Sequence, residues 1–157
     1  MKTLLIVIGK TQNAHLSAMM DDYAARISHY LPFSMEIIPE LKNTRGLSFA
    51  QQKEREGKEL LQRLQGGDRL ILLDEHGKER RSVEFATYLE KQLNSGCKRL
   101  VFVVGGPYGF SDEVYQKADQ LISLSQMTFS HQMIRLLFLE QVYRAQTILH
   151  GEPYHHE

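Results

Sequence analysis

The chain has 157 residues, 42% of them hydrophobic, and its 19 Lys and Arg residues balance its 19 Asp and Glu residues. This length suits one domain, residues 1–157, with its own buried core. Because the net charge is zero, attraction to a polyanion must come from local patches. The single Cys97 excludes an internal disulfide and fits a reducing compartment. Apolar runs are too short for a signal peptide or a membrane span, so we expect a soluble, cytoplasmic protein.

Short apolar runs and helical patterns alternate along the first half of the chain. Residues 3–9 read as a buried strand, and residues 16–31 carry apolar side chains every three or four positions, which predicts a helix. Residues 33–37 alternate with period two, as a strand does. Ser48 and Gln51 form a capping-box pattern that opens a charged helix ending near residue 65.

The second half continues the alternation, with Ser82 and Ser130 as expected helix caps. Several of its strands are too apolar to have one wet face, which favours an α/β fold with a mainly parallel sheet covered by helices on both faces. The expected elements are a strand at 69–74, a turn at 75–77, a helix at 82–94, a strand at 100–104, a short helix at 111–118, a strand at 121–124 and a long helix from 130.

A glycine-dense turn, residues 105–109, follows the strand at 100–104. Glycine lets backbone groups approach a ligand closely, and ligands of open α/β sheets bind beyond the carboxyl ends of the strands. The polar loop 125–130 follows the next strand, so we expect the two loops to wall one pocket. A tight turn without a ligand explains residues 105–109 equally well, and both interpretations stay open.

The glycine turn does not match a phosphate-binding fingerprint. Pro107 stands where a G-x-G-x-x-G motif beginning at Gly105 needs its second glycine, and no Walker-type phosphate loop occurs in the chain. Dinucleotides and nucleoside triphosphates are therefore disfavoured. A ligand with an adenine and an apolar or zwitterionic arm, but no pyrophosphate, suits such loops better.

Chemically active side chains gather near the C-terminus. Arginines there can hold phosphates, and a histidine can exchange a proton near neutral pH. The pair Glu140 and Arg144, four residues apart, also fits an ordinary ion pair. No closed metal site is expected from the terminal histidines. The group comprises His131, Arg135, Glu140, Arg144, His150, Tyr154, His155 and His156.

Two loops carry positive charge, at Lys42 with Arg45 and at residues 78–81. Such clusters are usually only solvated. They could follow an RNA backbone if they lie on the same side of the molecule as the glycine turn.

Taken together, several segments resemble a family of small bacterial enzymes, the SPOUT-class 23S rRNA pseudouridine-N3 methyltransferases. The resemblance spans essentially the whole chain, and the combination of motifs is specific where each alone is weak. The segments are Leu-Asp at 73–74, Val-Gly-Gly-Pro-Tyr-Gly at 104–109, Leu-Ser-Gln-Met-Thr-Phe-Ser-His at 124–131, Leu-Glu-Gln-Val-Tyr-Arg-Ala at 139–145 and Pro-Tyr-His at 153–155.

This resemblance implies a deep C-terminal trefoil knot, a homodimer, S-adenosyl-L-methionine as methyl donor and 23S rRNA of the assembled ribosome as substrate. The residues themselves lead us to expect no metal and no membrane partner. His156 before Glu157 departs from the family's usual C-terminal ending. Carried over by position, the cofactor contacts are Leu73, Gly105, Leu124, Ser125, Gln126, Met127, Thr128 and Phe129.

The imide N3 of a pseudouridine must lose its proton before it can attack a methyl group. We hypothesise that His155, held by Tyr154, removes or relays this proton, and that Arg144 favours the developing negative charge. Arg135 and His131 are expected to contact RNA. Two other classes stay open: a ribosome-associated RNA-binding module that keeps the cofactor pocket without turnover, and a flavodoxin-like small-molecule enzyme.

Overall fold

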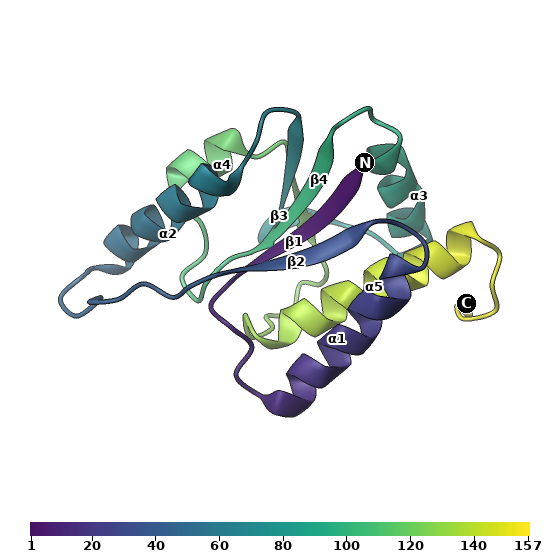
Figure 1. Ribbon diagram of the computed structural model, residues 1–157, viewed down its shortest axis with the longest axis horizontal. Helices are drawn as coiled ribbons and strands as arrows, with labels where there is room; N and C mark the ends of the chain where they lie inside the picture. The colour runs from purple at the N-terminus through teal and green to yellow at the C-terminus, as the bar shows by residue number, and fades with distance from the viewer.

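A parallel five-stranded sheet with the strand order β2-β1-β4-β3-β5 forms the centre of the computed structural model, which describes all 157 residues. Every neighbouring pair of strands is parallel, so all carboxyl ends point the same way (Figure 1). The expected parallel α/β fold is thus confirmed. The strands are β1 Lys2–Ile8, β2 Phe33–Ile38, β3 Asp68–Glu79, β4 Arg99–Val104 and β5 Gln120–Ser123.

The central strands are apolar without interruption because both of their faces are buried. Successive side chains of a strand point to opposite faces of the sheet. In β4, Leu100, Phe102 and Val104 belong to one hydrophobic core, whereas Val101 and Val103 belong to the other. The sheet therefore separates two cores, and each strand contributes to both.

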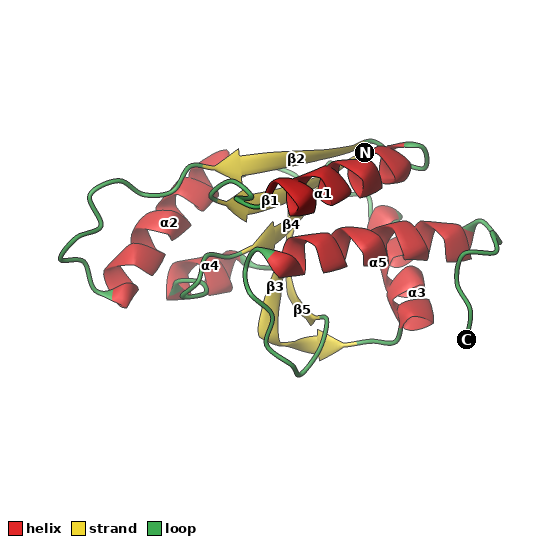
Figure 2. Cartoon of the chain, turned by 90° about the horizontal axis from the view of Figure 1, so that it is seen from below, coloured by secondary structure: helices red, strands yellow, loops and turns green.

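Helices cover the two faces unequally (Figures 1 and 2). Residues of α1, α3 and α5 build the larger core, and residues of α2 and α4 build the smaller one. No helix is both long enough and apolar enough to cross a bilayer. The helices are α1 Ala14–Ser28, α2 Phe49–Arg63, α3 Ser82–Leu93, α4 Asp112–Lys117 and α5 Met133–Leu149.

The turn expected at residues 75–77 is wrong, because β3 continues through them. The first part of β3 pairs with β5 through Leu73 and Ile122, and its last part pairs with β5 again, with Lys78 opposite Ile122. Between the two pairings a Cβ atom on Gly77 would lie only 2.4 Å from the carbonyl carbon of Ile122. A glycine here permits the close backbone contact that keeps the strand paired.

The cap expected at Ser82 is also wrong. Arg81 is the N-cap residue of α3, and its backbone N–H donates to Glu84 at 2.9 Å. The hydroxyl of Ser82 donates instead to Gln141 of α5, at 2.9 Å. A tertiary hydrogen bond between two helices has replaced the local one. The trefoil knot implied by the resemblance stays a prediction.

We expect Gly77→Ala to destabilise the fold by about 3 kcal/mol, because the new methyl group would overlap the backbone of Ile122 and separate β5 from β3. Gly66→Ala is the matched control, since no atom lies within 4 Å of its Cβ position. Urea unfolding of both variants measures the difference. Equal stability of the two variants would contradict this description of the β3–β5 contact.

Candidate functional site

A hollow of about 710 Å³ opens where β4 and β5 end and where β3 bends, at residues 73–76. We call it the sheet-edge hollow. The glycine turn forms one wall and the loop after β5 forms another, as expected for loops at the carboxyl ends of parallel strands. The structure brings every residue expected to contact the cofactor to this one hollow: Leu73, Gly105, Leu124, Ser125, Gln126, Met127, Thr128 and Phe129.

The glycine turn is packed tightly from behind. A Cβ atom on Gly105 would lie 3.1 Å from the ring of Phe110, and one on Gly106 would lie 2.8 Å from a carboxylate oxygen of Glu56. Gly109 has a φ of +82° and donates its N–H to the carbonyl of Gly106 at 3.2 Å. Side chains at these positions would displace the turn, whose backbone lines the sheet-edge hollow.

The loop after β5 is shaped by its own serines. The hydroxyl of Ser123 donates to the carbonyl of Ser125 at 2.9 Å, and the hydroxyl of Ser125 accepts from the N–H of Met127 at 3.0 Å. Ser130 accepts from the N–H of Met133 at 3.0 Å, just before α5 starts. These hydrogen bonds within the loop stabilise its shape, while Met127 stays 76% exposed.

Asp74 organises the wall formed by the bend in β3. Its side chain is only 7% exposed, accepts from the hydroxyl of Tyr115, and lies 2.8 Å from Nδ1 of His76. Burial, together with the hydrogen bond to Asp74, raises the pKa of Tyr115. The phenol therefore stays a donor at neutral pH, and it ties α4 to the end of the first half of β3.

The expectation that Arg135 contacts RNA is wrong. Its side chain is fully buried, and its guanidinium donates to the carbonyls of Ile8 at 2.6 Å and Gly9 at 2.8 Å. Its Nε donates to the carbonyl of His131, at 3.0 Å. Arg135 thus joins the start of α5 to the carboxyl end of β1 and satisfies carbonyls that the sheet leaves unpaired. His131 remains half-buried on the sheet-edge hollow, and burial lowers its pKa.

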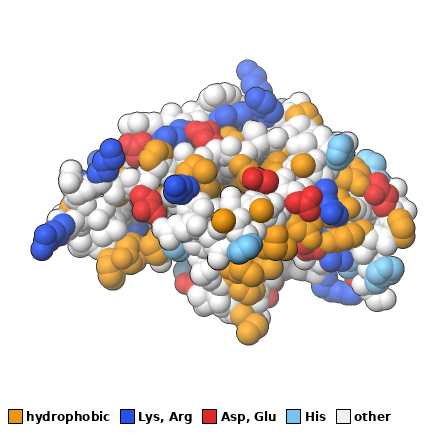
Figure 3. Space-filling view, turned by 60° about the horizontal axis from the view of Figure 1, so that its bottom comes forward, with side chains coloured by type: hydrophobic (Ala, Val, Ile, Leu, Met, Phe, Trp, Pro, Cys, Tyr) orange, Lys and Arg blue, Asp and Glu red, His pale blue; other side chains and the backbone are white.

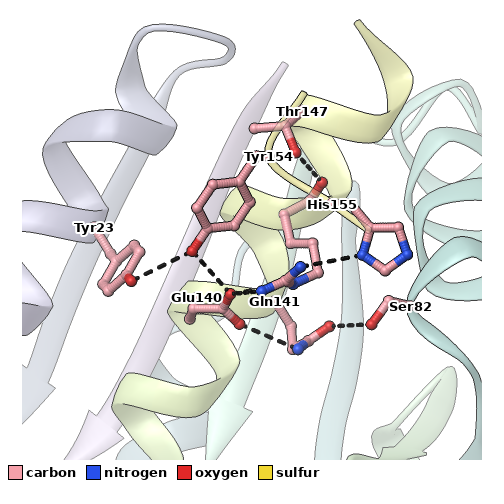
Figure 4. Close-up of polar contacts among 8 residues, drawn as sticks. Tyr23, Ser82, Glu140, Gln141, Thr147, Tyr154 and His155 are labelled. Carbon is pink, nitrogen blue, oxygen red and sulfur yellow. Dashed lines mark hydrogen bonds and ion pairs between the residues drawn. The ribbon is translucent and has the colours of Figure 1, made fainter. Parts of the chain in front are cut away.

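The C-terminal tail docks on α5 through a polar network, shown in Figure 4. The hydroxyl of Tyr154 donates to Glu140 at 3.1 Å, and Arg144 donates to the same carboxylate at 2.7 Å. Nδ1 of His155 lies 3.1 Å from Arg144 Nη1. Burial, the hydrogen bond with Tyr23 and the charge of Glu140 raise the pKa of Tyr154. Arg144, Tyr154 and His155 therefore form one hydrogen-bonded cluster around Glu140.

This cluster does not line the sheet-edge hollow of its own chain. A cavity of about 230 Å³ adjoins the hollow and shares Ile122, Ser123, Leu124 and Phe129 with it. Ser82 and Gln141 line this cavity on the side of the tail, and Gln141 donates to Glu140 at 3.1 Å. Lys78 and Arg80 also line the cavity. The positively charged segment 78–81 thus lies near the sheet-edge hollow.

A carboxylate is buried behind the glycine turn, and the sequence pattern does not predict its burial. Glu56 lies on α2, whose alternating charges indicate a solvent face, yet its Oε1 is buried without a hydrogen-bond partner. Burial raises its pKa, and the charge of Glu40 raises it further. Only the packing of α2 against residues 105–106 reveals this group. No cluster of His, Cys, Asp and Glu side chains is arranged to hold a metal ion.

The sequence matches the family of predicted SPOUT methyltransferases over residues 1–155. The chain belongs to the SPOUT methyltransferase family. This SPOUT methyltransferase is 60% identical to the ribosomal RNA large subunit methyltransferase H of Bacteroides thetaiotaomicron and 61% identical to that of Parabacteroides distasonis, with full coverage of both chains in each case. A probable methyltransferase from Bordetella pertussis shares its fold, with a TM-score of 0.53, 10% identity and coverage of 92% of this chain and 94% of that one.

Replacing Arg135 by methionine is expected to cost about 3 kcal/mol of unfolding free energy, because the carbonyls of Ile8 and Gly9 lose a charged donor in a buried place. Arg55→Met is the control, since Arg55 is exposed on α2 and forms no ion pair. Chemical denaturation compares the two variants. A loss at Arg135 no larger than at Arg55 would show that the buried contacts do not stabilise the protein.

Replacing Glu56 by glutamine is expected to stabilise the protein at pH 7. A raised carboxyl pKa means that the folded protein holds the proton more tightly than the unfolded chain, so the ionised group opposes folding. The gain should disappear as the pH falls below 4.5, the ordinary value for this carboxyl, because both states are then protonated. Unfolding measured across pH tests this, with the exposed Glu54→Gln as control. A pH-independent difference would contradict it.

Proposed function

We propose that this methyltransferase transfers the methyl group of S-adenosyl-L-methionine to N3 of a pseudouridine in 23S rRNA of the assembled ribosome, as a homodimer of single-domain chains. One observation carries the proposal: the residues expected to contact the cofactor surround one hollow at the carboxyl ends of β4 and β5 and at the bend of β3. The full-length relatives named ribosomal RNA large subunit methyltransferase H support an rRNA substrate. Such a substrate implies action in the cytoplasm.

The sheet-edge hollow suits this cofactor in size and in chemistry. Its volume of about 710 Å³ lies in the range of small-molecule sites. Leu73, Leu124 and Phe129 offer apolar surface for an adenine, and the glycine turn and Ser125 offer polar backbone and hydroxyl groups. No phosphate loop is needed, because the cofactor has no phosphate. When bound, it supplies a sulfonium methyl group that a nitrogen lone pair can displace in line.

A second subunit would supply the proton-handling groups. Arg144, Tyr154 and His155 lie outside the hollow of their own chain, so they can act on a nucleotide there only if a partner's tail meets it. Figure 3 shows a band of hydrophobic side chains on the face that carries α1 and α5. Met19 on α1 is 51% exposed and Met133 on α5 is 45% exposed. An apolar face of this kind is typical of an interface between subunits.

The tail cluster also sets a condition on His155 as the base. Arginine only donates, so Nδ1 of His155 must accept from Arg144, and the neutral ring then carries its proton on Nε2. The ring has no free lone pair until Arg144 moves. We propose that Arg144 turns toward the negative charge of the RNA, which frees Nδ1 to take the imide proton. Substrate binding and proton removal are then coupled through one side chain.

Calorimetry with S-adenosyl-L-methionine and transfer of a labelled methyl group to unmethylated ribosomes test the activity together. We expect both binding and transfer. Binding without transfer would indicate an RNA-binding module, and no binding would point to a different small-molecule enzyme. Either result would contradict the proposal.

His155→Ala is expected to lower methyl transfer at pH 7 by about a hundredfold or more and to change its pH profile, as loss of a general base does. Its affinity for the methyl donor should stay unchanged. His29→Ala, at an exposed position after α1, serves as control. An unchanged rate and pH profile for His155→Ala would remove this role.

A further inference from the structure

Two aromatic rings stack on the surface beside the glycine turn. Phe49, the first residue of α2, and Tyr108 have ring centroids 4.0 Å apart and ring planes inclined by 16°. Phe49 is 63% exposed and Tyr108 is 38% exposed. Aromatic pairs that serve packing are normally buried, because most of their stabilisation comes from removing area from water. This stack instead leaves much of the ring of Phe49 open to solvent.

The stack stands at the rim of the sheet-edge hollow. Tyr108 lines the hollow, and so does Lys53, one turn further along α2. Phe49 is held beside them by its contact with Tyr108. A flat molecule lying on the outer face of Phe49 would therefore be a close neighbour of anything bound in the hollow.

Unpaired positive charges lie near Phe49 along the chain. Lys42 and Arg45 lie exposed in the loop between β2 and α2, and neither they nor Lys53 form an ion pair. The first turn of α2 holds no acidic residue. In Figure 3, hydrophobic atoms and Lys or Arg atoms lie near one another at the left end of the molecule, where Figure 1 shows the start of α2. The loop that carries Lys42 and Arg45 therefore leads directly to Phe49, whose ring contacts Tyr108 of the glycine turn.

An exposed aromatic face flanked by free cations is the combination that binds single-stranded nucleic acid. Bases stack on the ring, and the cations follow the phosphates. Neither feature alone indicates this, since the chain has no net charge and α2 carries glutamates further along. A protein partner would need a larger apolar area than one ring pair provides.

We propose that Phe49, backed by Tyr108, is a stacking platform for an unpaired base of the RNA substrate next to the modified nucleotide, and that Lys42 and Arg45 contact the adjoining phosphates. The proposal rests on the proposed RNA methyltransferase function and adds a substrate-binding site outside the sheet-edge hollow. By holding the neighbouring base, the platform orients the strand whose target base enters the hollow.

Steady-state methylation of unmethylated ribosomes tests the platform with Phe49→Ala, Phe49→Leu and Phe49→Trp. Loss of one stacked base is expected to raise the KM for ribosomes by roughly five- to a hundredfold in the Ala and Leu variants, with little change in kcat. The Trp variant should retain a KM close to that of the native protein, because it keeps an aromatic face. Ile37→Ala is the matched control, because Ile37 is a similarly exposed apolar side chain, 49% exposed, on the outer strand β2.

Calorimetry with S-adenosyl-L-methionine and thermal unfolding of the same variants separate binding from structure. The cofactor affinity and the unfolding temperature of each variant should match those of the native protein. A KM unchanged in Phe49→Ala would overturn the platform, and so would an equal loss of cofactor affinity, which would make the ring pair a clamp on the glycine turn. If the native protein methylates no ribosomes, the proposed function itself fails, which is a distinct result.

The salt dependence of ribosome binding tests the proposed phosphate contacts of Lys42 and Arg45. Ribosome affinity of the native protein should fall steeply with salt, and the slope of log affinity against log salt should become shallower by roughly one to two in Lys42→Ala/Arg45→Ala. Lys91→Ala/Lys98→Ala, which removes two charges from another part of the surface, should leave the slope unchanged. Equal slopes in the native protein and the Lys42/Arg45 variant would contradict these contacts.

Discussion

The close backbone contact between Gly77 and Ile122 is the constraint on which the site depends. It lets β3 pair with β5 twice, before and after its bend, so β5 ends on the same edge of the sheet as β4, with β3 between them. The loop 124–129 and the glycine turn then face one another across a hollow. A larger side chain at position 77 would separate these two walls, although residue 77 lines no part of the hollow itself.

Helix α5 performs two tasks with similar residues. At its start, the buried Arg135 pairs with carbonyls at the end of β1 and fixes where the helix begins. Further along, Glu140 and Arg144 hold the C-terminal tail through Tyr154 and His155. One arginine is thus structural and the other stays close to the surface, where a substrate can compete for it. The same helix therefore positions the loop that we propose binds the cofactor and the tail that we propose handles the proton.

The pattern of apolar residues predicted the fold well, because strands buried on both faces and helices with one apolar face leave clear periodicities. It also predicted the pairing of the glycine turn with the loop after β5, since both follow parallel strands. Three other predictions from the sequence are wrong: the turn at residues 75–77, the cap at Ser82 and the RNA contact at Arg135. In each case a tertiary contact overrides the local signal. Charge patterns cannot reveal that Glu56 is buried or that Phe49 meets Tyr108, because both facts depend on how α2 packs against the glycine turn.

A crystal structure with bound S-adenosyl-L-methionine tests the central claim most directly. We expect the nucleoside in the sheet-edge hollow, against Leu73, the backbone of Gly105 and the loop 124–129, with its methyl group open toward a nucleotide-sized space. Electron density for the nucleoside in any other place, with side chains of the protein filling the hollow, would contradict it.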